Sequence, residues 1–172
     1  MSAIYKHGSE EQKQEWLPRM ASGEVIGCFG LTEPTAGSDL ANMLTTARRD
    51  GDEWGIDGAK RWIGLANVAQ VAIIWAKAAG MVRGFIVPTD TQGFTATPIT
   101  QKLSLRASIQ CEISLDGVPI PSFRRIPASR APSCASTRRA LASASARWVL
   151  HTTRSRPPLS KGASLASVGS AR

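Results

Sequence analysis

The chain has 172 residues, 42% of them apolar and 6% aromatic, which is enough for one domain with a sizeable core and is ordinary for a soluble protein. The net charge of +8 is unevenly distributed: residues 1–121 hold 11 basic and 13 acidic side chains, and residues 122–172 hold 10 basic and no acidic ones. The basic character therefore belongs to the C-terminal part alone and does not mark the rest as a nucleic-acid or membrane protein.

The cysteines and the apolar runs further limit the class of protein to which the sequence can belong. Cys28, Cys111 and Cys134 form no metal-like pair and leave one thiol over, which disfavours a disulfide framework and favours a reducing compartment. No apolar run reaches the roughly 18 residues of a membrane span. Lys6 and Glu10 interrupt any secretory signal. We expect a cytoplasmic protein without a membrane span.

A helix is the first element that the sequence predicts. Ser9 is followed three residues later by Gln12, the pattern of a capping box. The predicted helix runs from Glu10 to Leu17 and ends at Pro18, whose ring cannot continue it. It is too short to stand alone, so we expect it to be the end of a helical region that begins upstream of Met1.

From residue 25 onward the pattern of apolar and polar residues has a period of two, which predicts strands. In "EWGIDGAKRWIG" the dipeptide Asp57-Gly58 separates two short runs and predicts a hairpin turn. Further strands are predicted at "AQVAIIWAK", "RGFIVP", "GFTATPI" and "CEISLDGVPIP", with turn signals at Ala79-Gly80, Thr91-Gln92-Gly93 and Asp116-Gly117. This spacing predicts a mainly β fold over residues 25–121, an antiparallel sandwich or barrel.

The composition changes after Pro121. Residues 122–172 contain 11 Ser, 10 Ala, 9 Arg and 4 Pro, with no acidic residue. Such a segment buries too little apolar surface to offset its ordering entropy, so we predict an irregular or disordered tail. The same composition is typical of a GC-rich gene read in the wrong frame, and a frameshift near Pro121 is our hypothesis. A basic arm for nucleic acid is the competing reading, but Trp148 is the only aromatic residue among these arginines after Phe123.

Several common enzyme motifs are absent. The sequence contains no G-x-G-x-x-G after a strand, no G-x-x-x-x-G-K-[ST] and no G-x-S-x-G. Only two histidines, His7 and His151, are available for a Ser-His-Asp triad or a histidine-bearing metal site. We therefore predict neither.

The stretch "GLTEPTAGSDL", residues 30–40, is rich in hydrogen-bonding groups. Thr32 and Ser38 supply hydroxyls, and Gly37 lets a flat ligand approach the backbone. Such a loop suits a polar heteroaromatic ring or a phosphate, although a well-capped surface turn explains the same residues. Trp62 could stack on a planar cofactor or could simply anchor the core.

The segments "GCFGLTEPTAGSD" and "GAKRWIG" resemble the two signature segments of the acyl-CoA dehydrogenases, flavoproteins that desaturate acyl-CoA thioesters. The resemblance covers Ile4 to Pro121. It implies that residues 1–24 end an N-terminal helical domain and that residues 25–121 form the middle β-barrel. "CFGLTEP" and "KLSLRAS" resemble glutaryl-CoA dehydrogenase, which converts glutaryl-CoA to crotonyl-CoA with loss of CO2.

The resemblance implies FAD as the cofactor and assigns roles to residues. Thr32 would bond the pyrimidine edge of the flavin, and Ser38 would contact both FAD and the acyl-CoA substrate. Gly64 replaces a threonine that many members carry, and Ser104–Arg106 would lie on a strand facing CoA. The residues implied to bind FAD are Phe29, Leu31, Thr32, Gly37, Ser38, Trp62, Ile63 and Gly64.

The family's catalytic base is a glutamate in a C-terminal helical domain. No carboxylate side chain follows Asp116, so we assign no catalytic residue and expect this chain to be inactive alone. The resemblance also implies an electron-transfer flavoprotein as acceptor, a homotetramer, and the mitochondrial matrix if the source is eukaryotic. Two alternatives remain open: a noncatalytic ligand-binding β module, and a nucleic-acid-binding protein led by its basic tail.

Overall fold

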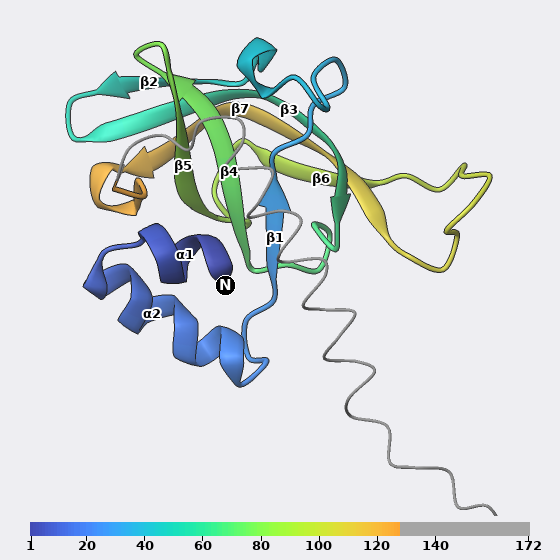
Figure 1. Cartoon of the computed structure of the whole chain (residues 1–172), viewed down its shortest axis with the longest axis horizontal. Helices are drawn as coiled ribbons and strands as arrows, with labels where there is room; N and C mark the ends of the chain where they lie inside the picture. Colours follow the sequence, from blue (N-terminus) through green and yellow to red (C-terminus); the bar gives the residue numbers. More distant parts are fainter. Residues whose placement is uncertain (128–172) are drawn as a thin grey trace, which may run out of the picture.

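The structure is a computed structural model that describes residues 1–127 (Figure 1). Residues 128–172, which make up most of the predicted tail, lie outside the described residues, and so do the predictions made for them. The elements in chain order are α1 (Ser2–His7), α2 (Glu10–Ala21), β1 (Gly27–Gly30), η1 (Leu40–Asn42), β2 (Thr46–Asp50), β3 (Glu53–Gly64), β4 (Val71–Ala78), β5 (Met81–Pro88), β6 (Phe94–Pro98), β7 (Gln110–Pro121) and η2 (Ser122–Arg124).

The predicted capping box opens α2. Gln12 N donates to Ser9 Oγ at 3.3 Å and Ser9 N donates to Gln12 Oε1 at 3.1 Å, which confirms the helix start. The predicted end was wrong, because α2 continues through Pro18 to Ala21. Pro18 removes one N–H, but its carbonyl still accepts from Ser22 N at 3.0 Å, so the last turn stays closed. No helix in residues 1–127 is long and apolar enough to cross a membrane.

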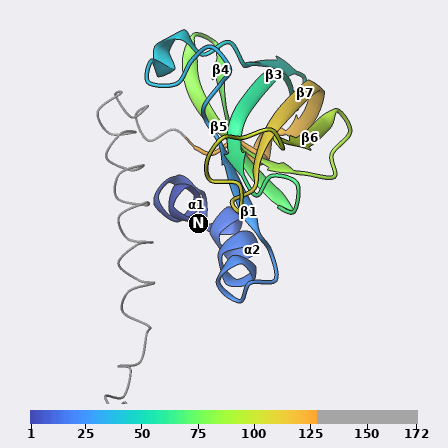
Figure 2. The same ribbon diagram turned by 90° about the vertical axis from the view of Figure 1, so that its right-hand side faces the viewer.

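The strands form one curled sheet, and the mainly β prediction is confirmed. The order is β1-β4-β2-β3-β7-β6, with β5 on the other edge of β4 (Figure 1). Two pairings are parallel rather than antiparallel: β1 lies along the first half of β4, and β2 meets its end, with Thr46 opposite Lys77. Figure 2 shows the sheet curling into a half-barrel, with α1 and α2 packed at one side.

Strand β4 is buried on both faces, which explains its nearly continuous apolar sequence. One face, with Ala72 and Ile74, belongs to a core shared with β3, β5 and β7. The opposite face, with Ile73, belongs to a second core that includes Ile4 and Trp16 of the helices. The helices therefore cover the outer face of the same strand that lines the half-barrel.

The predicted hairpin at Asp57-Gly58 was wrong. β3 runs unbroken from Glu53 to Gly64, and the turn that precedes it contains Gly51, with φ +56°. Gly58 has φ +147°, and a Cβ added there would lie 2.6 Å from Thr45 Oγ1, so the glycine serves a close approach of two backbones rather than a turn.

Other turn signals gave mixed results. Ala79-Gly80 does join β4 to β5, with positive φ at both residues, as a two-residue hairpin requires. Asp116-Gly117 lies within β7 instead of ending a strand. There β7 has an extra residue relative to β3, a β-bulge whose Gly117 N donates to Asp57 Oδ1 at 2.8 Å.

The residues directly after β7 pack onto the domain, although we assigned them to the irregular tail. Gln12 Nε2 donates to Phe123 O at 2.6 Å and to Arg125 O at 3.2 Å, and Ile126 is buried in the helix-side core. Ile126 N donates to Gly84 O at 2.9 Å. A buried amide on α2, a buried apolar side chain and a main-chain bond to β5 thus hold this short segment.

Candidate functional site

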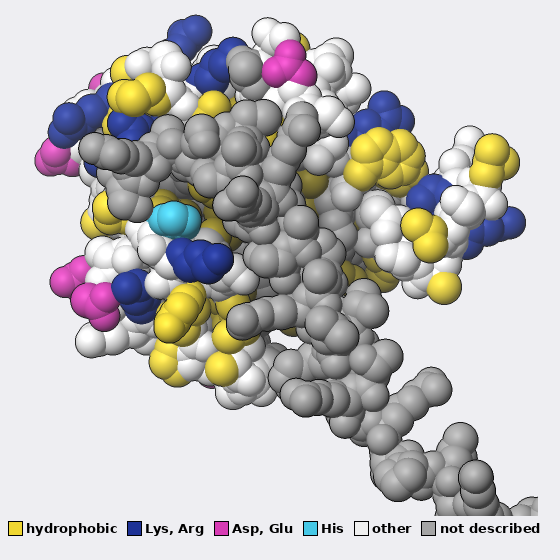
Figure 3. Space-filling model, viewed as in Figure 1, with side chains coloured by type: hydrophobic (Ala, Val, Ile, Leu, Met, Phe, Trp, Pro, Cys, Tyr) yellow, Lys and Arg dark blue, Asp and Glu magenta, His cyan; other side chains and the backbone are white. Residues whose placement is uncertain are grey.

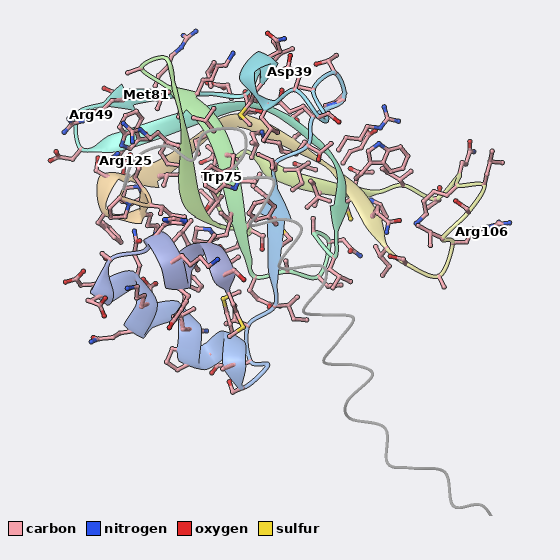
Figure 4. The ribbon with its side chains drawn as sticks, in the orientation of Figure 1. Asp39, Arg49, Trp75, Met81, Arg106 and Arg125 are labelled. Atoms are coloured by element: carbon pink, nitrogen blue, oxygen red, sulfur yellow. The ribbon has the colours of Figure 1, made fainter. Side chains whose placement is uncertain are left out.

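The segment between β1 and β2, here called the 31–45 loop, leaves the sheet and returns to the same edge. β1 occupies the first half of the β4 edge and β2 begins near its end, so the intervening residues must leave the plane of the sheet. In Figure 4 Asp39 marks the outer part of this loop, on the far side of the sheet from the helices. The candidate residues Thr32, Gly37 and Ser38 lie on it.

A buried ion pair holds the 31–45 loop against β3. Lys60 Nζ lies 2.8 Å from Glu33 Oε1, and the two side chains are 0% and 2% exposed. Lys60 Nζ also donates to Leu31 O at 3.3 Å. The other carboxylate contacts are with the end of the loop: Leu44 N donates to Oε2 at 2.6 Å, and Thr45 N donates to Oε1 at 2.9 Å.

The surroundings of Glu33 favour the ionised form of its carboxylate. Burial alone raises the pKa of Glu33, but hydrogen bonds from Lys60, Thr45 and Leu44 outweigh burial and leave the pKa below its usual value. Burial lowers the pKa of Lys60, and the bond and charge of Glu33 offset part of that effect. The pair satisfies the condition for burying charge, since each partner has hydrogen bonds besides the ionic contact.

A bulge on β3 exposes Trp62. Lys60 pairs with Ile113 and Ile63 pairs with Cys111, so two residues of β3 stand opposite one of β7. The extra residue turns Ile63 into the core and leaves Trp62 51% exposed, with φ +63°. This conformation is uncommon for a bulky residue and marks a local strain.

The loop and the bulge meet through the backbone. Arg61 N donates to Thr32 O at 2.9 Å, which places Thr32 beside the residue that precedes Trp62. Thr32 is half-buried, and its hydroxyl makes no hydrogen bond within the described part of the chain. A Cβ added at Gly37 or Gly64 would meet no atom within 4 Å, so both backbones border open space.

The other predicted residues are placed differently. Leu31 and Ile63 are buried in the two cores, which leaves only their main-chain atoms for a ligand. Phe29 packs on Trp75, with ring centroids 6.1 Å apart. Ser38 is exposed on the loop.

The prediction that Ser104–Arg106 lie on a strand was wrong. These residues lie on the connection between β6 and β7, residues 99–109, and not on a strand. This connection projects from the sheet with Arg106 near its tip (Figure 4), and the same end carries hydrophobic and basic side chains on its surface (Figure 3). Lys102 Nζ donates to Leu105 O at 3.1 Å and organises the connection from within.

Sequence reasoning missed the Glu33–Lys60 pair. Glu33 and Lys60 stand in the two segments that carry the family resemblance, but no role was assigned to either of them. One signal was present in the sequence: Ile56, Gly58 and Lys60 share one face of a strand, so a charged residue fell on an inward position that requires a partner.

Comparison with known proteins agrees with this architecture. Residues 28–118 match the family model "Acyl-CoA dehydrogenase, middle domain", and residues 1–24 match "Acyl-CoA dehydrogenase, N-terminal domain". A Bacillus subtilis protein named "Probable acyl-CoA dehydrogenase YngJ" is 42% identical over 127 residues, which are 70% of this chain and 33% of that protein. The human mitochondrial short-chain specific acyl-CoA dehydrogenase is 38% identical over 126 residues, 70% of this chain and 31% of the human protein.

Solved structures give the same result. A glutaryl-CoA dehydrogenase from Mycobacterium smegmatis in complex with FADH2 is 55% identical, with TM-score 0.74, over 77% of this chain and 34% of that one. An acyl-CoA dehydrogenase from Bacillus anthracis complexed with FAD is 32% identical, with TM-score 0.70, over 73% of this chain and 22% of that one. The chain spans about a third of the length of the curated relatives it matches. This chain belongs to the acyl-CoA dehydrogenase family.

Proposed function

We propose that the chain supplies the flavin-facing part of an FAD-dependent acyl-CoA dehydrogenase. The observation that carries the proposal is the main-chain bond from Arg61 to Thr32, 2.9 Å long, which joins the hydroxyl-bearing loop to the bulge that exposes Trp62. One such place offers both a hydrogen-bonding edge and an aromatic face, the two features that a flavin ring requires. The FAD and FADH2 complexes among similar structures support FAD.

The residues present fit this cofactor. Thr32 is half-buried and its hydroxyl has no partner among residues 1–127, and the backbone at Gly37 and Gly64 borders open space. Thr32 would donate to the polar edge of the ring, and Trp62 would cover part of a face. Ser38 would lie toward the substrate. When bound, FAD would supply the hydride acceptor for oxidation of a thioester between its α and β carbons.

We further propose the glutaryl-CoA branch, with crotonyl-CoA and CO2 as products. Support comes from two Mycobacterium smegmatis glutaryl-CoA dehydrogenase structures that are 55% and 53% identical to this chain. The reaction needs a carboxylate base for the α proton. Asp116 is the last carboxylate side chain in the sequence, so we expect the chain by itself to bind cofactor without turnover.

The wider assembly follows from the same proposal. Residues 1–24 would close an N-terminal helical domain, and residues 25–121 would form the middle domain. An electron-transfer flavoprotein would be the acceptor, and the intact enzyme would be a homotetramer. We infer a cytoplasmic location, or the mitochondrial matrix in a eukaryote; relatives named as mitochondrial support the latter.

A titration of FAD into the chain, followed by flavin fluorescence, tests the proposal. Thr32→Val keeps the shape of the side chain and removes its hydroxyl. Losing one hydrogen bond should weaken FAD binding about threefold to tenfold, equivalent to about 0.5–1.5 kcal/mol. Thr35→Val is the matched control, because Thr35 is an exposed threonine of the same loop and should bind as the wild type does. Equal affinity of all three proteins would contradict the assigned role of Thr32.

A further inference from the structure

We propose that Glu33 and Lys60 act as a positioning pair that sets the placement of Thr32 relative to Trp62. The inference rests on the proposed FAD site and goes beyond it, since neither side chain can reach a ligand from its buried place. The pair would act through the backbone of the 31–45 loop on one side and through β3 on the other.

Lys60 brackets Thr32. Its Nζ donates to Leu31 O at 3.3 Å and pairs with Glu33 Oε1 at 2.8 Å, so one ammonium group holds the residues directly before and after Thr32. The Thr32 carbonyl accepts from Arg61 N at 2.9 Å. Three successive residues of the loop are therefore fixed to two successive residues of β3.

Glu33 joins the beginning of the loop to its end. The carboxylate accepts from Leu44 N at 2.6 Å, from Thr45 N at 2.9 Å and from Thr45 Oγ1 at 2.5 Å. These bonds close a loop of more than ten residues around one buried group. Loss of the carboxylate would leave two backbone N–H groups of the returning segment without an acceptor, which favours opening of the loop.

Lys60 also stands at the start of the bulge. It is the last residue of β3 in regular pairing, opposite Ile113, before the shift that exposes Trp62. Its stem packs against β1, since a Cβ added at Gly30 would lie 3.5 Å from Lys60 Cγ. A displacement of Lys60 would therefore move both the bulge and β1, the strand that leads into the loop.

The chemistry of the pair favours a geometric role over a purely stabilising one. A buried ion pair is often no more stabilising than apolar side chains of similar volume, because both charges lose their hydration. Directional bonds to Leu31, Leu44 and Thr45, however, cannot be made by apolar side chains. The pair thus specifies one shape of the loop at a position where an apolar pair would only fill space.

The test compares the full chain with Lys60→Met and with the double variant Glu33→Gln/Lys60→Met. The single change leaves a buried carboxylate without its cation, and the double change removes both charges, so the double variant should be the more stable of the two. The matched control is Glu10→Gln/Lys13→Met, which neutralises the exposed pair on α2, 2.7 Å apart. Three quantities are measured under conditions where each protein is folded: FAD affinity, the absorption band of bound flavin at saturation, and amide hydrogen exchange without ligand.

For the Glu33→Gln/Lys60→Met protein we expect FAD binding at least about tenfold weaker, a shifted flavin band, and faster exchange at Leu44 and Thr45 with unchanged exchange in β4 and β5. A purely structural role would leave the band and the affinity of the folded variant unchanged, and that result would overturn the inference. If the wild type itself binds no FAD, the proposed function fails, and exchange then decides the positioning role: selective loosening of residues 31–45 supports it, and unchanged exchange refutes it.

Discussion

The carboxylate of Glu33 and the ammonium of Lys60 lie 2.8 Å apart with almost no exposure to solvent, although they are 27 positions apart in the sequence. One partner comes from a proline-containing loop and the other from the middle of a strand. The contact joins the two sequence segments that carry the family resemblance.

Stability should depend on pH through Glu33. Its pKa is below the usual value in the folded state, so its contribution is fully present above the unfolded-state value of about 4.3 and is lost as pH falls through the folded pKa. Lys60 is the charged group that faces it. The deficit in melting temperature of Glu33→Gln relative to wild type should be large near neutral pH and should shrink below about pH 4. Equal deficits at pH 3 and pH 7 would contradict this.

Gly58→Ala should destabilise the fold by about 1–3 kcal/mol or more. The new Cβ would lie 2.7 Å from Thr45 Cα, and φ is +147°. Gly55→Ala in the same strand is the matched control, because its Cβ would meet nothing within 4 Å and its φ is not positive. Urea unfolding measures both variants. If Gly58→Ala were as stable as Gly55→Ala, the close approach to Thr45 would be wrong.

Gln12→Ala should loosen the segment after β7. Its amide donates to the carbonyls of Phe123 and Arg125, and their loss should cost about 1–3 kcal/mol. Gln14→Ala, an exposed glutamine on the same helix, should change the free energy of unfolding little. Thermal unfolding compares the two, and hydrogen exchange at Ile126, whose N–H bonds Gly84, should rise only in Gln12→Ala.

Cys28 should be inert to thiol reagents while the protein is folded. Burial, with a smaller effect of Cys111, raises the pKa of Cys28 to about 12, so almost no thiolate forms near neutral pH. Iodoacetamide labelling at pH 8, followed by peptide mass spectrometry, should modify Cys28 only after denaturant is added. Rapid labelling of the folded protein would show that the half-barrel core is open to solvent.

Features set by neighbouring residues could be predicted from the sequence. The Ser9–Gln12 capping box depends on residues three apart, and the Ala79-Gly80 turn needs only two residues with positive φ. Both are as predicted. The residues of the candidate site were predicted by resemblance, and the structure brings Thr32 and the Trp62 bulge together through Arg61.

Features set by residues far apart in the sequence could not be predicted from it. Asp57-Gly58 has the composition of a hairpin turn, but pairing with β7 keeps β3 extended, and the Asp57 carboxylate instead accepts from Gly117. The parallel position of β1 beside β4 depends on residues more than 40 positions apart. The pairing of Lys60 with Glu33 could not be predicted either, since no local sequence pattern links the two residues.

We propose that the 31–45 loop and the Trp62 bulge form a flavin site. The most direct test is to purify the 172-residue chain with added FAD, desalt it and record its visible absorption. We expect a retained flavin band that is shifted relative to free FAD. A protein without flavin would contradict the site in this chain, while its membership of the acyl-CoA dehydrogenase family would stand.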